Sequence, residues 1–501
     1  MNFLAAFSSR ITRENLERRV ALCRVVFALL LFHRYFAISG FALLQNNPFS
    51  SFLVCLTLEV LSLFVLFGFL TPIALVALGY FLVFPRFAAN LADQVVIINI
   101  WGLVLLGAGR TFSLDSYLTK HSRWKKFIEP VYGLSRVCSL AQVRFLLILA
   151  FWGVCFSAIS YHFYDPLWLK GQVLQLMLDT PYLSQYYWVV HKARLQFPGL
   201  YHATCTLGLI VQGAWELLLF PLFFFRAGRA FVIIQGILFF IFSILLFQLQ
   251  YLPLQELVWW GLALAYSGGS EERRANWNFV FSTGTVAIGL FVIFSLVSAF
   301  VPSLQDSPPK IAFKVARAFG QYPVSVFNRE DLQMGANYFV LAELDNSDIP
   351  RRVVPANDIE GGRLDYLRND LFYFSYSLPW ARQTVKNRFL SDGTPSPFTE
   401  DLIQRMVRLD SCIRGYVNRT RYAAYFFNRE IHDGASFPSW TESSFAGSRD
   451  FSTEVPDGSW FCRHAFALPP GHLNSLGREE ATLEVIQKLG NKPIFDRKKT
   501  L

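Results

Sequence analysis

Residues 140–161 read LAQVRFLLILAFWGVCFSAISY, a run in which Arg144 is the one charged side chain. Crossing the ~30 Å hydrocarbon core of a bilayer takes about 20 residues of α-helix. The run has that length, and its side chains are almost all apolar. It is therefore predicted to be a membrane-spanning helix.

Eight further apolar segments of comparable length lie on either side of this run. They fall near residues 20–44, 49–69, 71–88, 94–112, 201–225, 229–249, 252–268 and 278–301. The sequence thus predicts an all-α polytopic membrane bundle of about nine spans within residues 1–301. The segment 252–268 is short and carries Pro253 and Glu256 near its start, so a re-entrant or interfacial helix is the alternative there.

The composition changes after the last apolar segment. Over the whole chain 53% of residues are hydrophobic, and nearly all of the excess over an ordinary soluble domain precedes Val301. Residues 302–501 read as globular sequence, with strand-like alternation at 338–340 and a helical period over 401–416. We expect a second, soluble domain there, of mixed α/β or β-rich fold.

Basic residues explain the net charge of +10 without a nucleic-acid partner. Cytoplasmic loops of membrane proteins are enriched in Lys and Arg. With nine spans, every basic loop falls on the N-terminal side; these residues are Arg10, Arg13, Arg18, Arg19, Lys120, Arg123, Lys125, Lys126, Arg136, Arg226, Arg229, Arg273 and Arg274. The N-terminus is therefore predicted to be cytoplasmic, and the C-terminal domain periplasmic or luminal.

The seven cysteines show no metal-ligand spacing, so we expect no metal site. Five of them lie within or beside apolar segments, where a small buried side chain is the ordinary interpretation. Cys412 and Cys462 lie in the C-terminal domain and could form a disulfide in an oxidising compartment.

Strongly polar side chains inside spans are costly and mark candidate functional positions. They are Arg24, His33, Arg34, Glu59, Asp93, Gln94, Arg144, Gln212, Glu216, Gln235, Gln248 and Glu256. Structural pairing is the alternative for each of them. Glu59 and Glu216 stand out because a lone carboxylate in mid-span must pair with a donor or be protonated.

The densest polar and aromatic cluster follows the fifth span, at 160–171, SYHFYDPLWLKG. His162 could act as a base, Asp165 could orient it, and Lys170 could neutralise an acidic substrate. The alternative is an aromatic belt at the membrane surface, which collects Tyr, Trp, His and Lys. The residue types alone favour neither interpretation.

Several motifs in this order resemble those of the horizontally transferred transmembrane (HTTM) domain family, which includes the vitamin K-dependent gamma-glutamyl carboxylases. The run RTFSLD at 110–115 resembles the family's W-S-x-D turn. The run AISYHFYDPLWLKG at 158–171 resembles its AG-x-x-K-L-x-x-x-W-x-x-G segment. The basic N-terminus with Arg24, and QYLP followed by WWGLA at 250–263, also fit. The resemblance extends over about residues 15–300.

The resemblance implies chemistry on reduced vitamin K or another quinol at the outer membrane face, with a lysine as the base and a histidine assisting it. This chain departs at both positions, since the lysine position falls at 161–163 (Tyr-His-Phe) and the histidine position at Ala92 and Asp93. His162 with Asp93 is the substitute pair that we expect, with Lys170 at the rim. Trp168, Asp165 and Glu216 are expected to line the substrate pocket.

Two functions follow from these observations. The first is a quinol-dependent or other lipid-dependent modifying enzyme that acts on a protein or peptide. The second is a non-catalytic membrane scaffold or maturation factor that binds lipid or a client protein. The missing lysine and histidine favour the second over carboxylation.

The orientation can be tested by labelling single cysteines in intact cells with a membrane-impermeant thiol reagent. We expect no labelling at Lys125→Cys and labelling at Asp401→Cys, because the basic loop at 120–126 is predicted to be cytoplasmic. The reverse pattern would show that the bundle is inserted the other way.

Overall fold

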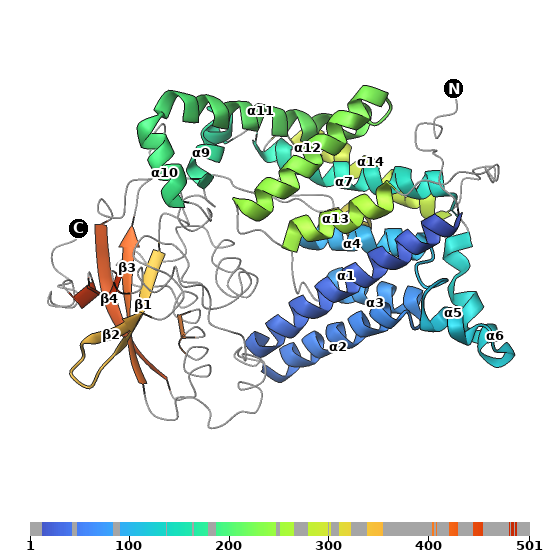
Figure 1. Cartoon of the computed structure of the whole chain (residues 1–501), viewed down its shortest axis with the longest axis horizontal. Helices are drawn as coiled ribbons and strands as arrows, with labels where there is room; N and C mark the ends of the chain where they lie inside the picture. The colour runs from blue at the N-terminus through green and yellow to red at the C-terminus, as the bar shows by residue number, and fades with distance from the viewer. Residues whose placement is uncertain are drawn as a thin grey trace.

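The computed structural model describes residues 13–42, 48–83, 91–136, 138–162, 165–178, 187–246, 251–264, 279–298, 300–301, 310–321, 338–353, 420–428 and 444–453, and single positions between 403 and 487. A helical bundle makes up most of this part of the chain, and a small sheet lies beyond one end of it (Figure 1).

Each predicted apolar segment contains a helix. These are α1 (Arg13–Ala42), α2 (Pro48–Phe67), α3 (Thr71–Val83), α4 (Leu91–Leu105), α7 (Leu140–His162), α11 (Pro198–Leu222), α12 (Arg226–Leu245), α13 (Tyr251–Ala263) and α14 (Phe279–Ser298). Among the described residues, α7, α11, α12 and α14 are long and apolar enough to cross a membrane. These helices indicate an integral membrane protein. The number of spans, nine, stays a prediction.

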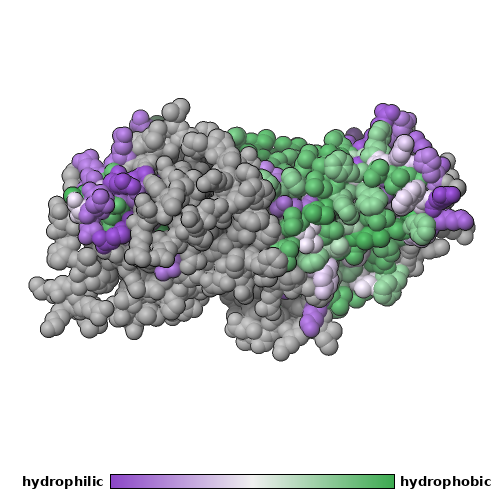
Figure 2. Space-filling view, turned by 90° about the horizontal axis from the view of Figure 1, so that it is seen from below, coloured by the Kyte–Doolittle hydropathy of each residue, from purple (hydrophilic) through white to green (hydrophobic). Residues whose placement is uncertain are grey.

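Helix α7 is the centre of the bundle. In its most apolar stretch 83% of the residues are buried. The corresponding share is 17% in α11, 22% in α12 and 33% in α14. The latter helices thus present apolar side chains outward, such as Ile210, Ile234 and Ile293. Figure 2, which views the molecule from the side opposite to α11, shows that the bundle also exposes a broad apolar surface there, far larger than a soluble monomer exposes. Contact with lipid tails explains this surface.

Helix α13 is short but lies deep in the bundle. It has 13 residues, about 20 Å of helix, which is less than the hydrocarbon thickness. Its Trp259 is fully buried, stacks on Phe151 at 4.1 Å between ring centroids and donates to the carbonyl of Leu147. An interior position explains why this segment tolerates Gln255 and Glu256, both of which are buried.

The RTFSLD run at 110–115 forms a tight turn that is hydrogen-bonded to the connection between α2 and α3. Its Asp115 is buried and accepts from the backbone N–H groups of Leu70 and Thr71 at 2.8 and 3.0 Å, at the first turn of α3. The hydroxyl of Tyr132 donates to the same carboxylate at 2.5 Å. A carboxylate at a helix N-terminus is favoured by the helix dipole. Asp115 therefore fixes the α2–α3 turn against the start of α5 (Leu114–Leu118).

The loop after α7 folds into short helices. They are α8 (Pro166–Leu169), α9 (Val173–Leu178) and α10 (Tyr187–Gln196). The middle one, α9, packs on the protein through Val173 and Leu176, which are buried. Two further helices are α6 (Ser122–Val131) and α15 (Lys310–Ala318). The 3-10 turn η2 (Gly133–Arg136) follows α6.

The C-terminal region contains an antiparallel sheet in the order β2-β1-β3-β4. Its strands are β1 (Tyr338–Leu344), β2 (Pro350–Val353), β3 (Thr420–Asn428) and β4 (Ser444–Thr453). The predicted strand at 338–340 is confirmed by β1. Residues 403, 404 and 407 are helical, whereas the rest of 401–416, with Cys412 and also Cys462, lies outside the described residues.

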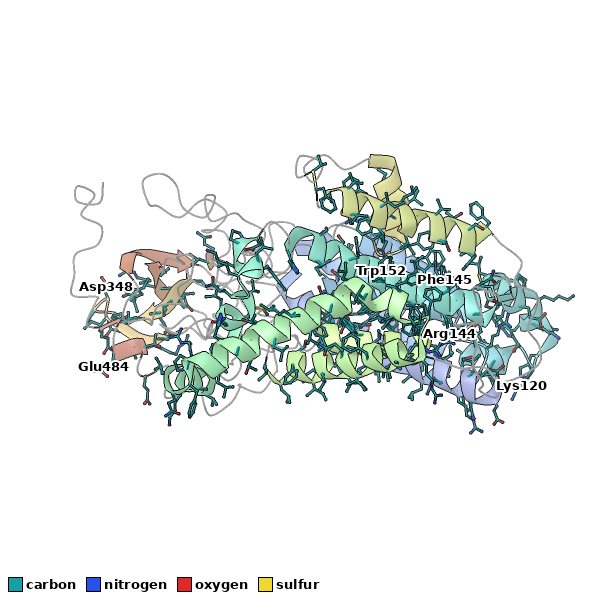
Figure 3. The ribbon with its side chains drawn as sticks, turned by 90° about the horizontal axis from the view of Figure 1, so that it is seen from above. Lys120, Arg144, Phe145, Trp152, Asp348 and Glu484 are labelled. Atoms are coloured by element: carbon teal, nitrogen blue, oxygen red, sulfur yellow. The ribbon has the colours of Figure 1, made fainter. Side chains whose placement is uncertain are left out.

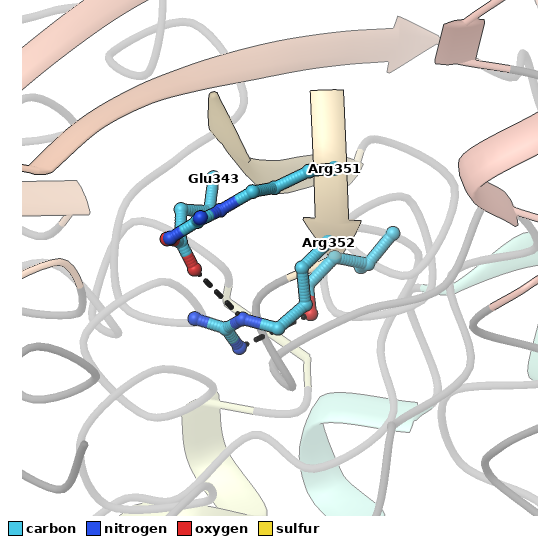
Figure 4. A network of polar contacts seen from close by, with 4 residues as sticks. Glu343, Arg351 and Arg352 are labelled. Atoms are coloured by element: carbon cyan, nitrogen blue, oxygen red, sulfur yellow. Dashed lines mark hydrogen bonds and ion pairs between the residues drawn. The ribbon is translucent and has the colours of Figure 1, made fainter. Parts of the chain in front are cut away.

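One ion-pair network fixes the β1–β2 hairpin. The carboxylate of Glu343 is buried, accepts from Arg352 Nε at 2.9 Å and also pairs with Arg351 (Figure 4). Beside it, Val340, Ala342 and Tyr425 pack into a small apolar core. The sheet thus has a core of its own, separate from that of the bundle.

Candidate functional site

The loop after the fifth predicted span is shaped by local capping. Asp165 is the N-cap of α8, and its carboxylate accepts from the backbone N–H of Leu167 at 2.9 Å. Pro166 follows at the first helical position, which its fixed φ suits. Gly171 has φ +70°, a conformation that favours glycine, and it turns the chain into α9. Asp165 therefore has a structural role in this loop.

His162 and Trp168 form a parallel stack in the same loop. Their ring centroids are 3.5 Å apart with 9° between the planes, and 6% of the His162 surface is exposed. Stacking covers a face of the imidazole but leaves its nitrogens, which lie on the ring edge, in position for hydrogen bonding. The structure thus brings together two of the predicted site residues, while Lys170, two residues after Trp168, is exposed.

Asp93 is held in a buried ion pair. Its Oδ1 lies 3.0 Å from Arg34 Nη1, and the two side chains are 1% and 0% exposed. The guanidinium of Arg34 also lies over the ring of Tyr251, 4.1 Å from its centroid. The pair therefore ties α1, α4 and α13 together. Two charges buried this completely are stable only when each neutralises the other.

His162 and Asp93 have different partners in the structure. Gly320 lies against the backbone of Gln94, and Gln321 beside it donates to the carbonyl of Ala150 and lies against Gly153. The part of α7 near Asp93 is therefore the stretch 150–153, and His162 is about three helical turns further on. A His162–Asp93 acid–base pair stays a prediction, and it would require Asp93 to leave Arg34.

Glu216 lies deeper in the bundle than the loop. Gly171 lies against Thr206 of α11, and Glu216 is ten residues, about 15 Å, further along the same helix. Gln212 donates to Glu216 Oε1 at 2.8 Å, and Gln235 of α12 donates to Gln212 Oε1 at 3.1 Å. Glu216 thus has a polar partner on its own helix, Gln212, and both side chains are half-buried.

The arginines Arg24 and Arg144 bind backbone carbonyls. Arg24 donates to the carbonyls of Ala108 and Phe112 at 3.0 and 2.6 Å. Arg144 Nε donates to the carbonyl of Ala263 at 2.8 Å. Both side chains are buried, so these carbonyls satisfy groups that the surroundings cannot hydrate.

A cavity of about 160 Å³ lies beside the RTFSLD turn, and Arg110, Asp115, Glu129 and Tyr132 are among its lining residues. Burial first, and the hydrogen bond to Asp115 second, raise the pKa of Tyr132 well above its usual range. Tyr132 is therefore neutral at physiological pH and serves as the donor to Asp115. Sequence reasoning did not place this cavity, although it identified the run that forms one wall.

Comparisons of the chain with protein-family models, with curated proteins and with solved structures find no match. The assignment of a function therefore depends on the geometry of these residues.

Replacing either member of the buried ion pair should destabilise the protein strongly. Arg34→Leu leaves the Asp93 carboxylate buried without its partner, which typically costs about 3–5 kcal/mol. The double variant Arg34→Leu/Asp93→Leu should lose less than Arg34→Leu alone, because no charge remains buried. Thermal unfolding in nanodiscs, followed by tryptophan fluorescence, measures this. Losses that simply add would show that the two residues do not stabilise one another.

The hydrogen bond between Gln212 and Glu216 should contribute to the free energy of unfolding through its donor, Gln212. Gln212→Leu removes a donor from a half-buried carboxyl group and should cost about 1–2 kcal/mol. Glu216→Gln should be tolerated, because an amide can also accept from Gln212. The same unfolding measurement applies. A Gln212→Leu protein as stable as the wild type would show that Glu216 has no need of this partner.

Proposed function

We propose that this chain is an integral membrane protein built on the transmembrane module of the family that it resembles, and that it acts as a non-catalytic scaffold or maturation factor. In this proposal the bundle binds membrane lipid, and the strand-bearing C-terminal region contacts a client protein on the far side of the membrane from the N-terminus.

The buried Arg34–Asp93 ion pair carries this proposal. Asp93 occupies the position where the resemblance requires the assisting histidine, and its carboxylate is neutralised by Arg34 at 3.0 Å. Releasing it to assist a base would leave the Arg34 guanidinium buried and unpaired, at a cost of several kcal/mol. A group held in this way stabilises the bundle and is a poor participant in proton transfer.

The loop residues support the same conclusion. Asp165 caps α8 and so has a role in folding the loop. Lys170, two residues beyond Trp168, is exposed to water. A lysine acting as a general base must instead be desolvated.

The second candidate is a quinol-dependent enzyme acting at the same loop. The stack of His162 on Trp168 favours it, because the stack holds a buried imidazole at the end of α7 with its nitrogens on the ring edge. A neutral imidazole at the membrane boundary can accept a proton from a phenolic hydroxyl. This candidate needs His162 to act without the assistance of Asp93.

A turnover assay separates the two functions. The full chain in nanodiscs is supplied with chemically reduced vitamin K, oxygen, bicarbonate and a glutamate-containing peptide, and quinol consumption and peptide carboxylation are measured. For a scaffold we expect the rates of empty nanodiscs, unchanged in His162→Ala. Turnover that falls by about 100-fold or more in His162→Ala would establish the enzyme and overturn the scaffold.

Genetic complementation provides a positive test of the scaffold function. In cells that lack the chain, the abundance of membrane and exported proteins is measured, and the affected clients are identified. Re-expression of His162→Ala/Lys170→Ala should restore them as fully as the wild type. Restoration by the wild type alone would contradict a non-catalytic role.

A further inference from the structure

Helix α6 has an amphipathic sequence, SRWKKFIEPV, outside the apolar bundle. Its spacing places Trp124, Phe127, Ile128 and Val131 on one face, at the i, i+3, i+4 and i+7 positions of a helix. The opposite face carries Arg123, Lys126 and Glu129. A helix with such separated faces lies at a boundary between an apolar and a polar phase.

Only part of the apolar face packs on the protein. Ile128 is 1% exposed and anchors the helix, whereas Trp124 is 50% exposed and Phe127 is 73% exposed. Phe112 and Tyr117, in the turn and helix just before α6, are 68% and 59% exposed. Several large aromatic side chains thus point outward from one small region, as in the aromatic belt of a membrane interface.

The charge around these aromatics is strongly positive. Lys120, Arg123, Lys125 and Lys126 lie within seven residues, and the acid that follows them in α6, Glu129, pairs with Lys125 at 3.8 Å. Long basic side chains beside an apolar face reach out to phosphate groups while their stems stay on the apolar surface. The surface is therefore complementary to anionic lipid headgroups.

The position of α6 agrees with this chemistry. α5 and α6 lie at the end of the bundle opposite to the sheet (Figure 1). Lys120 marks that end in Figure 3, far from Asp348 of the sheet. In Figure 2 the apolar surface of the bundle ends at this side in a polar rim. A helix at the rim of an apolar belt lies at the depth of the lipid headgroups.

We propose that α6 is a surface anchor that binds anionic phospholipid. Trp124 and Phe127 insert at the boundary between headgroups and acyl chains, and Arg123 and Lys126 bind the phosphates. The partner is the anionic leaflet on the N-terminal side of the membrane. This proposal is independent of whether the outer loop has catalytic activity.

Site-specific photo-crosslinking in the full chain tests the proposal. A benzophenone amino acid is placed at Phe127, and in a matched control at Glu129, which is also exposed but lies on the opposite face. Both proteins are reconstituted in nanodiscs of mixed phosphatidylglycerol and phosphatidylcholine, and adducts are identified by mass spectrometry. We expect phospholipid adducts severalfold more abundant at Phe127. Equal yields, or a protein adduct at Phe127, would overturn the proposal.

The preference for anionic lipid is tested on the same label. Arg123→Gln/Lys126→Gln should lower the ratio of phosphatidylglycerol to phosphatidylcholine adducts by about fivefold or more, since each basic residue near an anionic surface contributes to binding. The control Lys192→Gln/Lys314→Gln removes the same charge from exposed positions outside α6 and should leave the ratio unchanged. A ratio that is equal in all three proteins would contradict a headgroup site at α6.

Discussion

Water does not reach the middle of the bundle, so each charged group there must be satisfied by the protein itself. Three arginines that are buried in the described part of the chain illustrate this constraint: Arg34 is paired with Asp93, Arg24 binds carbonyls of the turn that follows α4, and Arg144 binds a carbonyl at the end of α13. Each contact joins segments that are distant in the sequence. The same groups that make the sequence look unfavourable for a membrane are thus what fixes α1, α4, α7 and α13 relative to one another.

The helices were predictable from the sequence because hydropathy reports on local composition. It located the segment of every bundle helix, including α13, where Gln255 and Glu256 weaken the apolar signal. Hydropathy could not decide whether that segment crosses the membrane or is a re-entrant helix, because the answer depends on how the neighbouring helices bury it. The sheet was predicted only in part, since β1 pairs with β3 across a long stretch of chain, and the pattern of one strand does not name its partner.

The candidate site shows the same division between local and distant contacts. The Asp-Pro pair at 165–166 is a helix start that can be read from the sequence, yet it was interpreted as chemistry because it lies beside His162. The pairing of Asp93 with Arg34 could not be predicted from the sequence. Hydropathy places both residues in spans, but it does not say which helix each side chain faces. The amphipathic period of α6 was available in the sequence. It was overlooked because the segment was treated only as a basic loop that reports topology.

The contact between Arg144 and the carbonyl of Ala263 has a consequence for how the protein is made. Helix α7 is synthesised well before α13, so its arginine enters the membrane before its acceptor exists. During that interval the nascent chain holds a charged helix that is later the most buried of the candidate spans. Biogenesis must therefore keep α7 in a protected setting, beside the insertion machinery or partly hydrated, until the later helices close around it. Truncated chains that end before residue 263 would retain this exposed charge and present a clear signal for membrane quality control.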